Sequence, residues 1–357
     1  MMQSRYAISP FTNPASVEAW DTWFRWREHG RLRDASIEAT WLRVSAALAG
    51  AEATDPERWS RCFFEAQASW QLLIDERILA SAGTPLGDWP HDPVALLNVA
   101  RFVVSPLAAD ASFAFDALGR AAEVAFRAVD NALLVRAGRD ISFTPQPRIG
   151  LVGLGDALAL LGKRYDSTAG RVAAGAIARA LAEGCLHANV RLARDRGNWG
   201  ASAGSPLANA RARDLSADLQ ADIARRGLRH VHSTAITSQP RLALFANAVA
   251  DAIDPLDAAA EKGAGHGAGE RTSRPAGYAF ALARRLGCEG TAATVLREST
   301  DISVAAQIEL RGAVQPWIDW PIDYPVRVSR EPDSRATRHW QRFANAYRLG
   351  NVRWAHA

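Results

Sequence analysis

Three glycines form the pattern in this sequence that is best suited to ligand chemistry. Gly150, Gly153 and Gly155 stand between an apolar run and a helix-period segment, where glycines let a backbone approach a pyrophosphate. Their order is G-x-x-G-x-G rather than the G-x-G-x-x-G of dinucleotide-binding proteins, and Gly170 and Arg171 stand where an acid that binds ribose is expected. A tight turn from strand to helix therefore explains the glycines without a ligand.

Two other patterns resemble known sites but lack their context. His230 and His232 fall on one side of a predicted strand, yet no third ligand accompanies them, so we predict packed or solvated histidines and no metal site. Gly200–Gly204 reads G-x-S-x-G, a motif of serine hydrolases. That motif needs a buried strand before the serine, whereas Arg194–Asn198 is polar and charged, so we predict a loop.

The three cysteines, Cys62, Cys185 and Cys288, are far apart and form neither a metal-binding nor a CxxC spacing. This usage is typical of a cytoplasmic chain with reduced thiols. Residues 1–14 are polar and hold no apolar core of a signal peptide, and no apolar run is long enough to span a membrane. We therefore predict cytoplasmic localisation, with neither export nor membrane insertion.

Composition limits the class of protein. Of the 357 residues, 48% are hydrophobic and 22% are charged, as in globular proteins that bury a sizeable core. The net charge of +4 comes from arginine, because Lys163 and Lys262 are the only lysines. The arginines are scattered beside acids and form no dense basic tract, so we predict solvated helix faces and no nucleic-acid partner.

Helical periodicity dominates the chain. Apolar residues at spacings of three and four predict helices within 15–52, over 56–68 and over 111–135, with Ser36 as an N-cap. A further helix has its N-cap within Asp166–Thr168 and ends at Gly197. Its predicted buried stripe comprises Val172, Ile177, Leu181, Leu186, Val190 and Leu192. The glycine-rich residues 261–277 predict a flexible surface loop.

The segment around the glycines resembles the large chain of ribonucleotide reductase, most closely the adenosylcobalamin-dependent class II enzymes. Arg148–Ser167 is similar to the family's R-x-G-L-G-x-x-G-L-x-D-x-L-x-x-L-G-x-x-Y-D-S segment, and Asn189–Gly197 is similar to the end of the helix that follows it. Earlier in the chain, Ser36–Glu52 and Arg77–Thr84 are similar, in the same order, to an S-I-x-x-T-x-x-R-V-A-x-A-L-A-x-x-E helix and a G-R-I-x-x-x-A-G-T segment.

The resemblance then passes over a large part of the family. Pro85–Val103 resembles a segment that lies several hundred residues further on in the reductases, just after the active-site cysteine. The resemblance implies that the missing part holds the allosteric region, the first half of the ten-stranded α/β barrel and the Asn-x-Cys-x-Glu motif, whose cysteine forms the thiyl radical. At the junction Leu79, Ser81 and Gly83 stand where Asn, Cys and Glu belong. Because a serine O–H is much harder to oxidise to a radical, we predict no catalytic residue.

The resemblance also places a phosphate-binding loop in this chain. In the reductases an R-N-x-x-x-x-x-I-A-P-T-G-T-I-S segment forms a strand and a loop whose amides and hydroxyls hold substrate phosphates. Its counterpart is Leu228–Pro240, where the loop glycine is lost and Pro240 removes a backbone donor. Thr237, Ser238 and Arg241 remain as candidate anion ligands of a degenerate loop. The alternative is plain capping of the following helix.

The C-terminal part resembles the family in outline while its chemical positions differ. Asp301–Asp319 is similar to a helix and turn of the reductases, with Gln307 in place of a histidine. Pro321–Arg327 replaces an S-K-T-x-N-x-P segment. Trp340–Trp354 resembles a W-x-x-G-L-K-G-x-T-x-Y-R ending, and the sequence contains no cysteine pair for re-reduction after it.

We therefore expect a mainly α-helical protein with a few short strands, a remnant of about half of the ten-stranded α/β barrel. Residues 1–84 are expected to form an N-terminal helical region and residues 85–357 the partial barrel, joined as one globular unit. A half-barrel leaves an open sheet edge and an apolar face, which something must cover.

The lost motifs predict a catalytically inactive relative of the reductase, acting as an interaction or regulatory protein. The expected partner is a second copy of the chain or a full-length reductase chain. One alternative is adenosylcobalamin-dependent reduction of ribonucleoside diphosphates with a cysteine borrowed from a partner chain. The other is binding of nucleotide or cobalamin without turnover. Both ligands are implied by the resemblance only.

Overall fold

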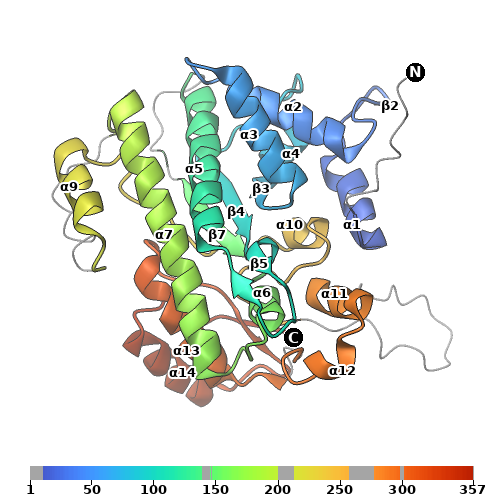
Figure 1. Cartoon of the computed structure of the whole chain (residues 1–357), viewed down its shortest axis with the longest axis vertical. Coiled ribbons are helices and arrows are strands. Elements are labelled where there is room, and N and C mark those ends of the chain that lie inside the picture. Colours follow the sequence, from blue (N-terminus) through green and yellow to red (C-terminus); the bar gives the residue numbers. More distant parts are fainter. Residues whose placement is uncertain are drawn as a thin grey trace.

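Helices dominate the computed structural model, and the strands are few and short (Figure 1). The structure describes residues 11–138, 145, 147–199, 213–256, 277–297 and 301–356, so the G-x-S-x-G motif and nearly all of the glycine-rich loop lie outside the described residues. The predicted fold class, mainly helical with a few short strands, is confirmed. The strands of the described ranges form open sheets and no closed barrel, as a partial barrel requires.

The helices account for most of the described residues. They are α1 (Pro14–Ala19), α2 (Ile37–Ala49), α3 (Pro56–Ala68), α4 (Glu76–Ser81), α5 (Phe115–Ala137), α6 (Leu154–Leu160), α7 (Thr168–Arg196), α9 (Ala217–Arg226), α10 (Pro240–Phe245), α11 (Tyr278–Leu286), α12 (Glu289–Ala292), α13 (Val304–Val314) and α14 (Ser334–Ala346), with short π or 3-10 turns at η1 (Trp20–Phe24), η2 (Val99–Phe102) and η4 (Gln315–Trp317). The strands are β1 (Arg27–Glu28), β2 (Arg31–Leu32), β3 (Leu72–Ile74), β4 (Val94–Asn98), β5 (Val103–Val104), β6 (Ser112–Phe113), β7 (Arg148–Val152), β8 (Val326–Val328) and β9 (Trp354–His356).

A three-stranded sheet lies in the core. Strand β3 pairs antiparallel with β4, and β4 pairs parallel with β7, which places Leu96 opposite Gly150. The sequences of β3 and β4 are apolar runs rather than alternating patterns, apart from Asn98 at the end of β4, and every residue of both strands is buried. Such runs are typical of strands that are covered on both faces.

The chain covers the outer edge of β7 with its own backbone. The Ile149 N–H donates to the Ser233 carbonyl (2.7 Å), and the Ala235 N–H donates to the Ile149 carbonyl (3.0 Å). Gly150 permits this approach, because a Cβ there would lie 2.5 Å from the Ala235 carbonyl oxygen. The open edge that we expected of a half-barrel is therefore closed internally on this side of the sheet.

The two long helices α5 and α7 pack against each other, and α5 also packs on all three strands of the sheet (Figure 1). They cross closely at Gly184 of α7, where a Cβ would lie 2.8 Å from the Ala122 Cβ of α5. The predicted caps of α7 are confirmed, since Ser167 Oγ accepts the Gly170 N–H (3.0 Å) and Gly197 ends the helix.

The predicted buried stripe of α7 is correct apart from its first residue. Ile177, Leu181, Val190 and Leu192 are buried, and Leu186 is partly buried. The prediction for Val172 was wrong, because its side chain is 68% exposed. At that level α7 borders a surface groove that it shares with α13, so no buried face is available there.

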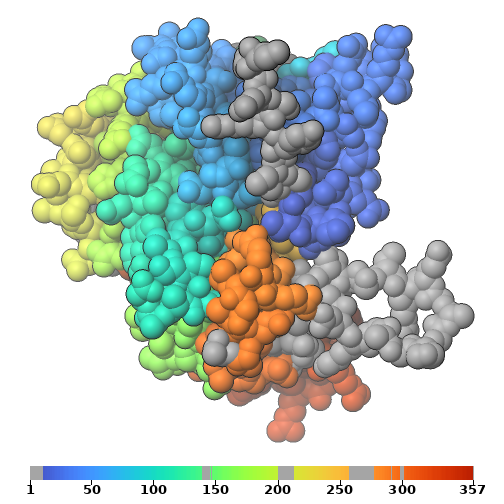
Figure 2. All heavy atoms as spheres, turned by 45° about the vertical axis from the view of Figure 1, so that its right-hand side comes forward, coloured from blue at the N-terminus to red at the C-terminus, as the bar shows by residue number. Residues whose placement is uncertain are grey.

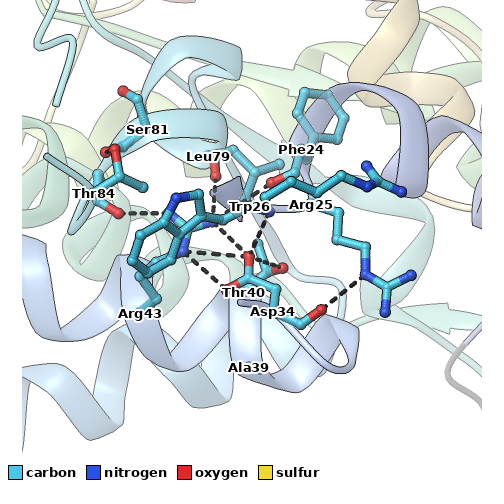
Figure 3. Close-up of polar contacts among 12 residues, drawn as sticks. Phe24, Arg25, Trp26, Asp34, Ala39, Thr40, Arg43, Leu79, Ser81 and Thr84 are labelled. Carbon is cyan, nitrogen blue, oxygen red and sulfur yellow. Dashed lines mark hydrogen bonds and ion pairs between the residues drawn. The ribbon is translucent and has the colours of Figure 1, made fainter. Parts of the chain in front are cut away.

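A buried ion pair fixes α2 against the end of α4 (Figure 3). The Asp34 carboxylate accepts from Arg43 Nη2 (2.8 Å) and from the Trp26 N–H (3.1 Å). The same guanidinium group donates to the Leu79 carbonyl (3.2 Å). Because one cation satisfies both a buried carboxylate and a helix-end carbonyl, loss of Arg43 would leave both unpaired.

The junction that the resemblance places at residues 84–85 is a hydrogen-bonded turn. The Thr84 N–H donates to the Ser81 carbonyl (3.0 Å), and the Asp88 N–H donates to Ser81 Oγ (2.8 Å). Gly83 between them adopts a φ of 75°, and a Cβ there would lie 2.8 Å from Arg43 Cγ. One cluster of buried hydrophobic residues includes side chains from both sides of the junction. The division into regions at residue 84 stays a prediction.

The C-terminal elements pack on the far part of α7. Helix α13 lies against α7, α14 lies against α13, and β8 pairs parallel with β9. Figure 2 shows α11 and α12 in orange beside the turquoise part of the chain. Arg101 Nη1 donates to the hydroxyl of Tyr278, the first residue of α11 (3.0 Å).

None of the helices in the described part of the chain has the length and hydropathy needed to cross a bilayer.

Candidate functional site

A cavity of about 630 Å³ opens at one end of the strands of the central sheet. Val94 and Arg148 are the first residues of the parallel strands β4 and β7, and Asp75 and Glu76 directly follow the antiparallel strand β3. All four residues therefore lie at the same end of the sheet, where they line the cavity. Residues 235–239, which follow the backbone bridge to β7, and residues 320–325 form most of the remaining wall. The volume suits a small organic ligand.

The arginines of the cavity are paired with carboxylates of the same wall. Arg77 Nη2 lies 3.1 Å from Asp92 Oδ1, and Arg148 Nη2 lies 3.7 Å from Asp92 Oδ2. Arg353 Nε lies 3.0 Å from Asp323 Oδ1. These pairs are largely exposed and each contributes little stability. They reduce the positive potential that an entering anion would meet.

Two further carboxylates lie on the β3 side of the cavity. Asp75 accepts the Arg77 N–H (2.9 Å) and the Val94 N–H (3.1 Å), yet burial raises the pKa of its carboxyl above the ordinary value. Burial also raises the pKa of Glu76, and the nearby Arg241 guanidinium group offsets this only in part. This side of the cavity is therefore acidic and poorly solvated.

The structure places two of the three candidate anion ligands, Thr237 and Ser238, in the cavity wall. Ser238 Oγ donates to Asp251 Oδ2 (2.7 Å), and the Gln239 N–H donates to Asp251 Oδ1 (2.9 Å). Asp251 thus occupies a hydroxyl and an amide that a bound phosphate would use. Helix α10 then begins at Pro240, which has no N–H, and no side chain caps it.

The third candidate, Arg241, is not among the residues that line the cavity. Its guanidinium carbon lies 5.2 Å from the centroid of the Trp23 ring, and Nη1 lies 3.5 Å from Glu76 Oε2. The structure therefore brings Thr237 and Ser238 together in one wall and holds Arg241 outside it.

Sequence reasoning missed a buried network behind the cavity. Tyr324 lines the cavity, and its hydroxyl lies 3.0 Å from Asp251 Oδ2 and 3.0 Å from Asp254 Oδ2. Arg327 Nε donates to Asp254 Oδ2 (2.7 Å). The available signal was the sequence D-A-I-D-P at 251–255, where two acids three residues apart interrupt an otherwise apolar segment.

Burial controls the protonation of this network. It raises the pKa of Asp254 to about 6, because attraction by Arg327 and Arg311 offsets the lost hydration only in part and Asp251 adds repulsion. Burial likewise raises the pKa of Tyr324 well above its ordinary value. Within the described residues, Asp254 Oδ1 has no hydrogen-bond partner. The network therefore releases a proton near pH 6 rather than near pH 4.

All three cysteines of the chain are described, and none lines the cavity. Cys185 is fully buried within α7, and burial raises the pKa of its thiol far above the ordinary value. Cys62 and Cys288 are partly buried elsewhere. At the junction Leu79 is buried in the core, and Ser81 Oγ donates to a backbone carbonyl of the preceding turn (2.7 Å).

The two candidate metal-binding histidines have different surroundings. His230 is buried, with Nε2 2.8 Å from Asp130 Oδ1, whereas His232 is exposed beside the Trp320 ring. Over the ranges that the structure describes, no three His, Cys, Asp or Glu residues gather as a metal site requires.

The glycines after β7 serve backbone packing, as the tight-turn interpretation predicts. Gly153 ends the strand with a φ of 75° and begins α6. A Cβ on Gly155 would lie 2.5 Å from the Asp254 carbonyl oxygen. These positions therefore require glycine for conformation and close approach, without any ligand.

Part of the chain matches a known protein family. Residues 93–263 match the family described as ribonucleotide reductase, barrel domain. This segment is similar to the barrel domain of the reductases. The matched range covers just under half of the chain, begins one residue before β4, and includes β7, α7, Thr237 and Ser238. No curated protein matches the chain.

The match supports the general part of the resemblance that the sequence showed, and not its details. A relationship to the reductase large chain is confirmed for the barrel segment. The N-terminal helices and the C-terminal elements lie outside the matched range. Assignment to class II and the internal deletion before Pro85 stay predictions.

Proposed function

We propose that this reductase-like protein is catalytically inactive and acts by binding another protein chain. The observation that carries the proposal is the composition of the cavity, where no cysteine lines the wall and Asp251 holds the hydroxyl and amide of the candidate phosphate loop. Ribose reduction in the reductases requires a cysteine that becomes a thiyl radical, and a carboxylate that takes a proton. The cavity has carboxylates but no thiol.

Neither the residues of the cavity nor those of the junction fit the chemistry of adenosylcobalamin in class II reductases. There the cofactor supplies the radical that oxidises the active-site cysteine. The nearest equivalents at the junction are Leu79 and Ser81, and the Ser81 hydroxyl is already hydrogen-bonded within the turn. The cofactor would therefore need a cysteine from a partner chain, because no thiol of this chain lies in the cavity.

The retained scaffold supports a protein partner. Strands β4 and β7 and helices α5 and α7 of the matched segment contribute to one buried hydrophobic core. We infer that the surface of this segment binds a second copy of the chain or a full-length reductase chain. These two are the partners that we propose.

Size-exclusion chromatography with light scattering tests the proposed partners. We expect a mass of at least twice 38.6 kDa, or co-elution with a full-length reductase large chain. A monomer that elutes separately from the reductase at every concentration would remove the interaction role. An unrelated α/β-barrel enzyme added in place of the reductase serves as the control for non-specific association.

Nucleotide binding without turnover is a second candidate function. The observation that favours it is the cavity itself, which combines Thr237 with the guanidinium groups of Arg77, Arg148 and Arg353. Calorimetric titration with ribonucleoside diphosphates decides the question. Binding that is weakened in Arg148→Gln would support it, and the absence of heat at millimolar nucleotide would exclude it.

A further inference from the structure

Helix α14 concentrates arginines that pair with no carboxylate in the described part of the chain. Arg335, Arg338 and Arg342 are exposed along the helix, Arg330 precedes it and Arg348 follows it. Other exposed helices carry their own counter-charges, as in α9, whose two terminal arginines both lie near one aspartate of the same helix. The positive charge of α14 is therefore free to meet an external anion.

These arginines share one face of α14. On a helix of 3.6 residues per turn, Arg335, Arg338, His339, Arg342 and Ala346 fall within about 100° of one another and extend over about 16 Å. The opposite face packs against α13 and β8. We call Arg335, Arg338, His339 and Arg342 the basic stripe.

The basic stripe leads to a pocket of about 760 Å³ at the C-terminal end of α14. Tyr347 and Arg348 line this pocket on one side, and Trp317 and His232 line it on the other. The guanidinium carbon of Arg179 lies 5.1 Å from the centroid of the Trp317 ring. The pocket therefore combines aromatic rings with cations, at the end of a row of further cations.

The acids near this surface offset only part of its charge. Asp319 pairs with Arg213 (2.9 Å), and Asp333 accepts an N–H of the first turn of α14 (2.8 Å). Asp214 and Glu331 are exposed at the edges. Five unpaired arginines along α14 and at its ends exceed these acids, so the surface has a net positive charge.

We propose that the basic stripe and the aromatic pocket bind single-stranded nucleic acid. Guanidinium groups bind phosphates through paired hydrogen bonds, and the partly exposed Trp317 and Tyr347 side chains in the pocket wall would make aromatic contacts to unstacked bases. An acidic protein would satisfy the arginines but would not use the aromatic pocket, and a duplex offers no unstacked base. The sequence led us to expect no nucleic-acid partner because the arginines are scattered along the chain. Five of them stand within residues 330–348, and the structure shows that three of these share one exposed face of α14.

Fluorescence anisotropy with labelled oligothymidine and oligouridine of about 20 nucleotides tests the proposal. We expect saturable binding that weakens with salt. In the triple variant Arg335→Gln, Arg338→Gln, Arg342→Gln we expect at least tenfold weaker binding. The slope of log K against log salt should fall by about two, from roughly 0.7 per lost phosphate contact.

The matched control is the triple variant Arg31→Gln, Arg61→Gln, Arg120→Gln. These arginines are also exposed and pair with no carboxylate in the described residues, so the control changes the net charge equally. It should bind as the native chain does, and both triple variants should unfold at the native midpoint. Equal losses in the two variants would overturn the proposal, because net charge alone would then explain the binding. No binding by the native chain, tighter binding of a duplex, or equal binding of polyglutamate would overturn it as well.

Discussion

Two buried aspartates of the matched segment differ in how the protein meets their charge. Asp130 on α5 lies 2.9 Å from Arg229 Nε and 2.8 Å from His230 Nε2, and it also pairs with Arg196. Burial alone would raise the pKa of Asp130, but these partners hold it well below the ordinary value. Asp254 behind the cavity has the opposite balance, since burial raises its pKa to about 6.

The Asp130 contacts stabilise the fold, whereas burial of the Asp254 carboxyl is electrostatically unfavourable. Around Asp130 the charges are matched, and Arg196 also reaches the Glu52 carboxylate at the end of α2 (2.8 Å). At Asp254 one carboxylate oxygen lacks a partner in the described residues, and the neighbouring Tyr324 faces the cavity. Perturbed carboxyl groups gather at functional sites. The cavity therefore keeps the electrostatic character of a binding site although it lacks the thiol that ribose reduction requires.

The largest expected effect is that of Asp130→Asn. The substitution leaves Arg229 and His230 without a carboxylate partner and Arg196 with Glu52 alone, so we expect a loss of about 3–5 kcal/mol in the free energy of unfolding. Urea denaturation followed by circular dichroism measures it. Asp222→Asn, which removes a surface pair with Arg225, should leave the midpoint unchanged. A loss below about 1 kcal/mol for Asp130→Asn would contradict the matched-charge interpretation.

The next effect concerns the pH dependence of stability. The folded pKa of Asp254 is raised, so between about pH 4 and pH 6 the folded chain holds a proton that the unfolded chain releases. The contribution of Asp254 to native stability should therefore fall by about 2–3 kcal/mol as the pH rises through this window. In Asp254→Asn this contribution should disappear, leaving that of Asp156, whose pKa burial also raises to about 6. Urea midpoints at four pH values give the slopes, and identical slopes for both chains would disprove the prediction.

A smaller effect is expected on anion binding at the cavity loop. Asp251→Asn removes a negative charge while keeping an oxygen for the Gln239 N–H. We expect inorganic phosphate to bind about tenfold more tightly to this variant, a difference of about 1.4 kcal/mol. Calorimetry at pH 7 measures the affinity, and Asp222→Asn, which removes a carboxylate that does not line the cavity, is the control. Unchanged phosphate binding in Asp251→Asn would mean that this carboxylate does not occupy the place of an anion.

The smallest expected effect is that of Cys185→Ala. The thiol is fully buried in α7 and packs against the core, so its removal should cost about 1 kcal/mol in the free energy of unfolding. Partner binding should not change. Cys62→Ala, which removes a partly buried thiol, is the matched control. Loss of function in Cys185→Ala at unchanged stability would assign this thiol a role beyond packing.

The local features of the fold could be predicted from the sequence, because short-range patterns determine them. The helix over 56–68 and the caps at Ser36, Ser167 and Gly197 are observed where periodicity and capping residues placed them. Val172 was predicted wrongly, since periodicity identifies an apolar residue but not the neighbour that covers it.

The cavity could be predicted only in part. The resemblance pointed to Thr237 and Ser238, which lie in its wall. The contact of Tyr324 with Asp254 joins positions 70 residues apart, and no local pattern indicates such a pair. The covering of β7 by residues 233–235 is equally long-range.

The proposed loss of catalysis has one direct test. Purified chain is supplied with ribonucleoside diphosphates, adenosylcobalamin and a dithiol, alone and together with a reductase large chain whose own active-site cysteine has been replaced. We predict that no deoxyribonucleotide forms under either condition. Formation of the deoxy product under either condition would contradict the proposed inactivity.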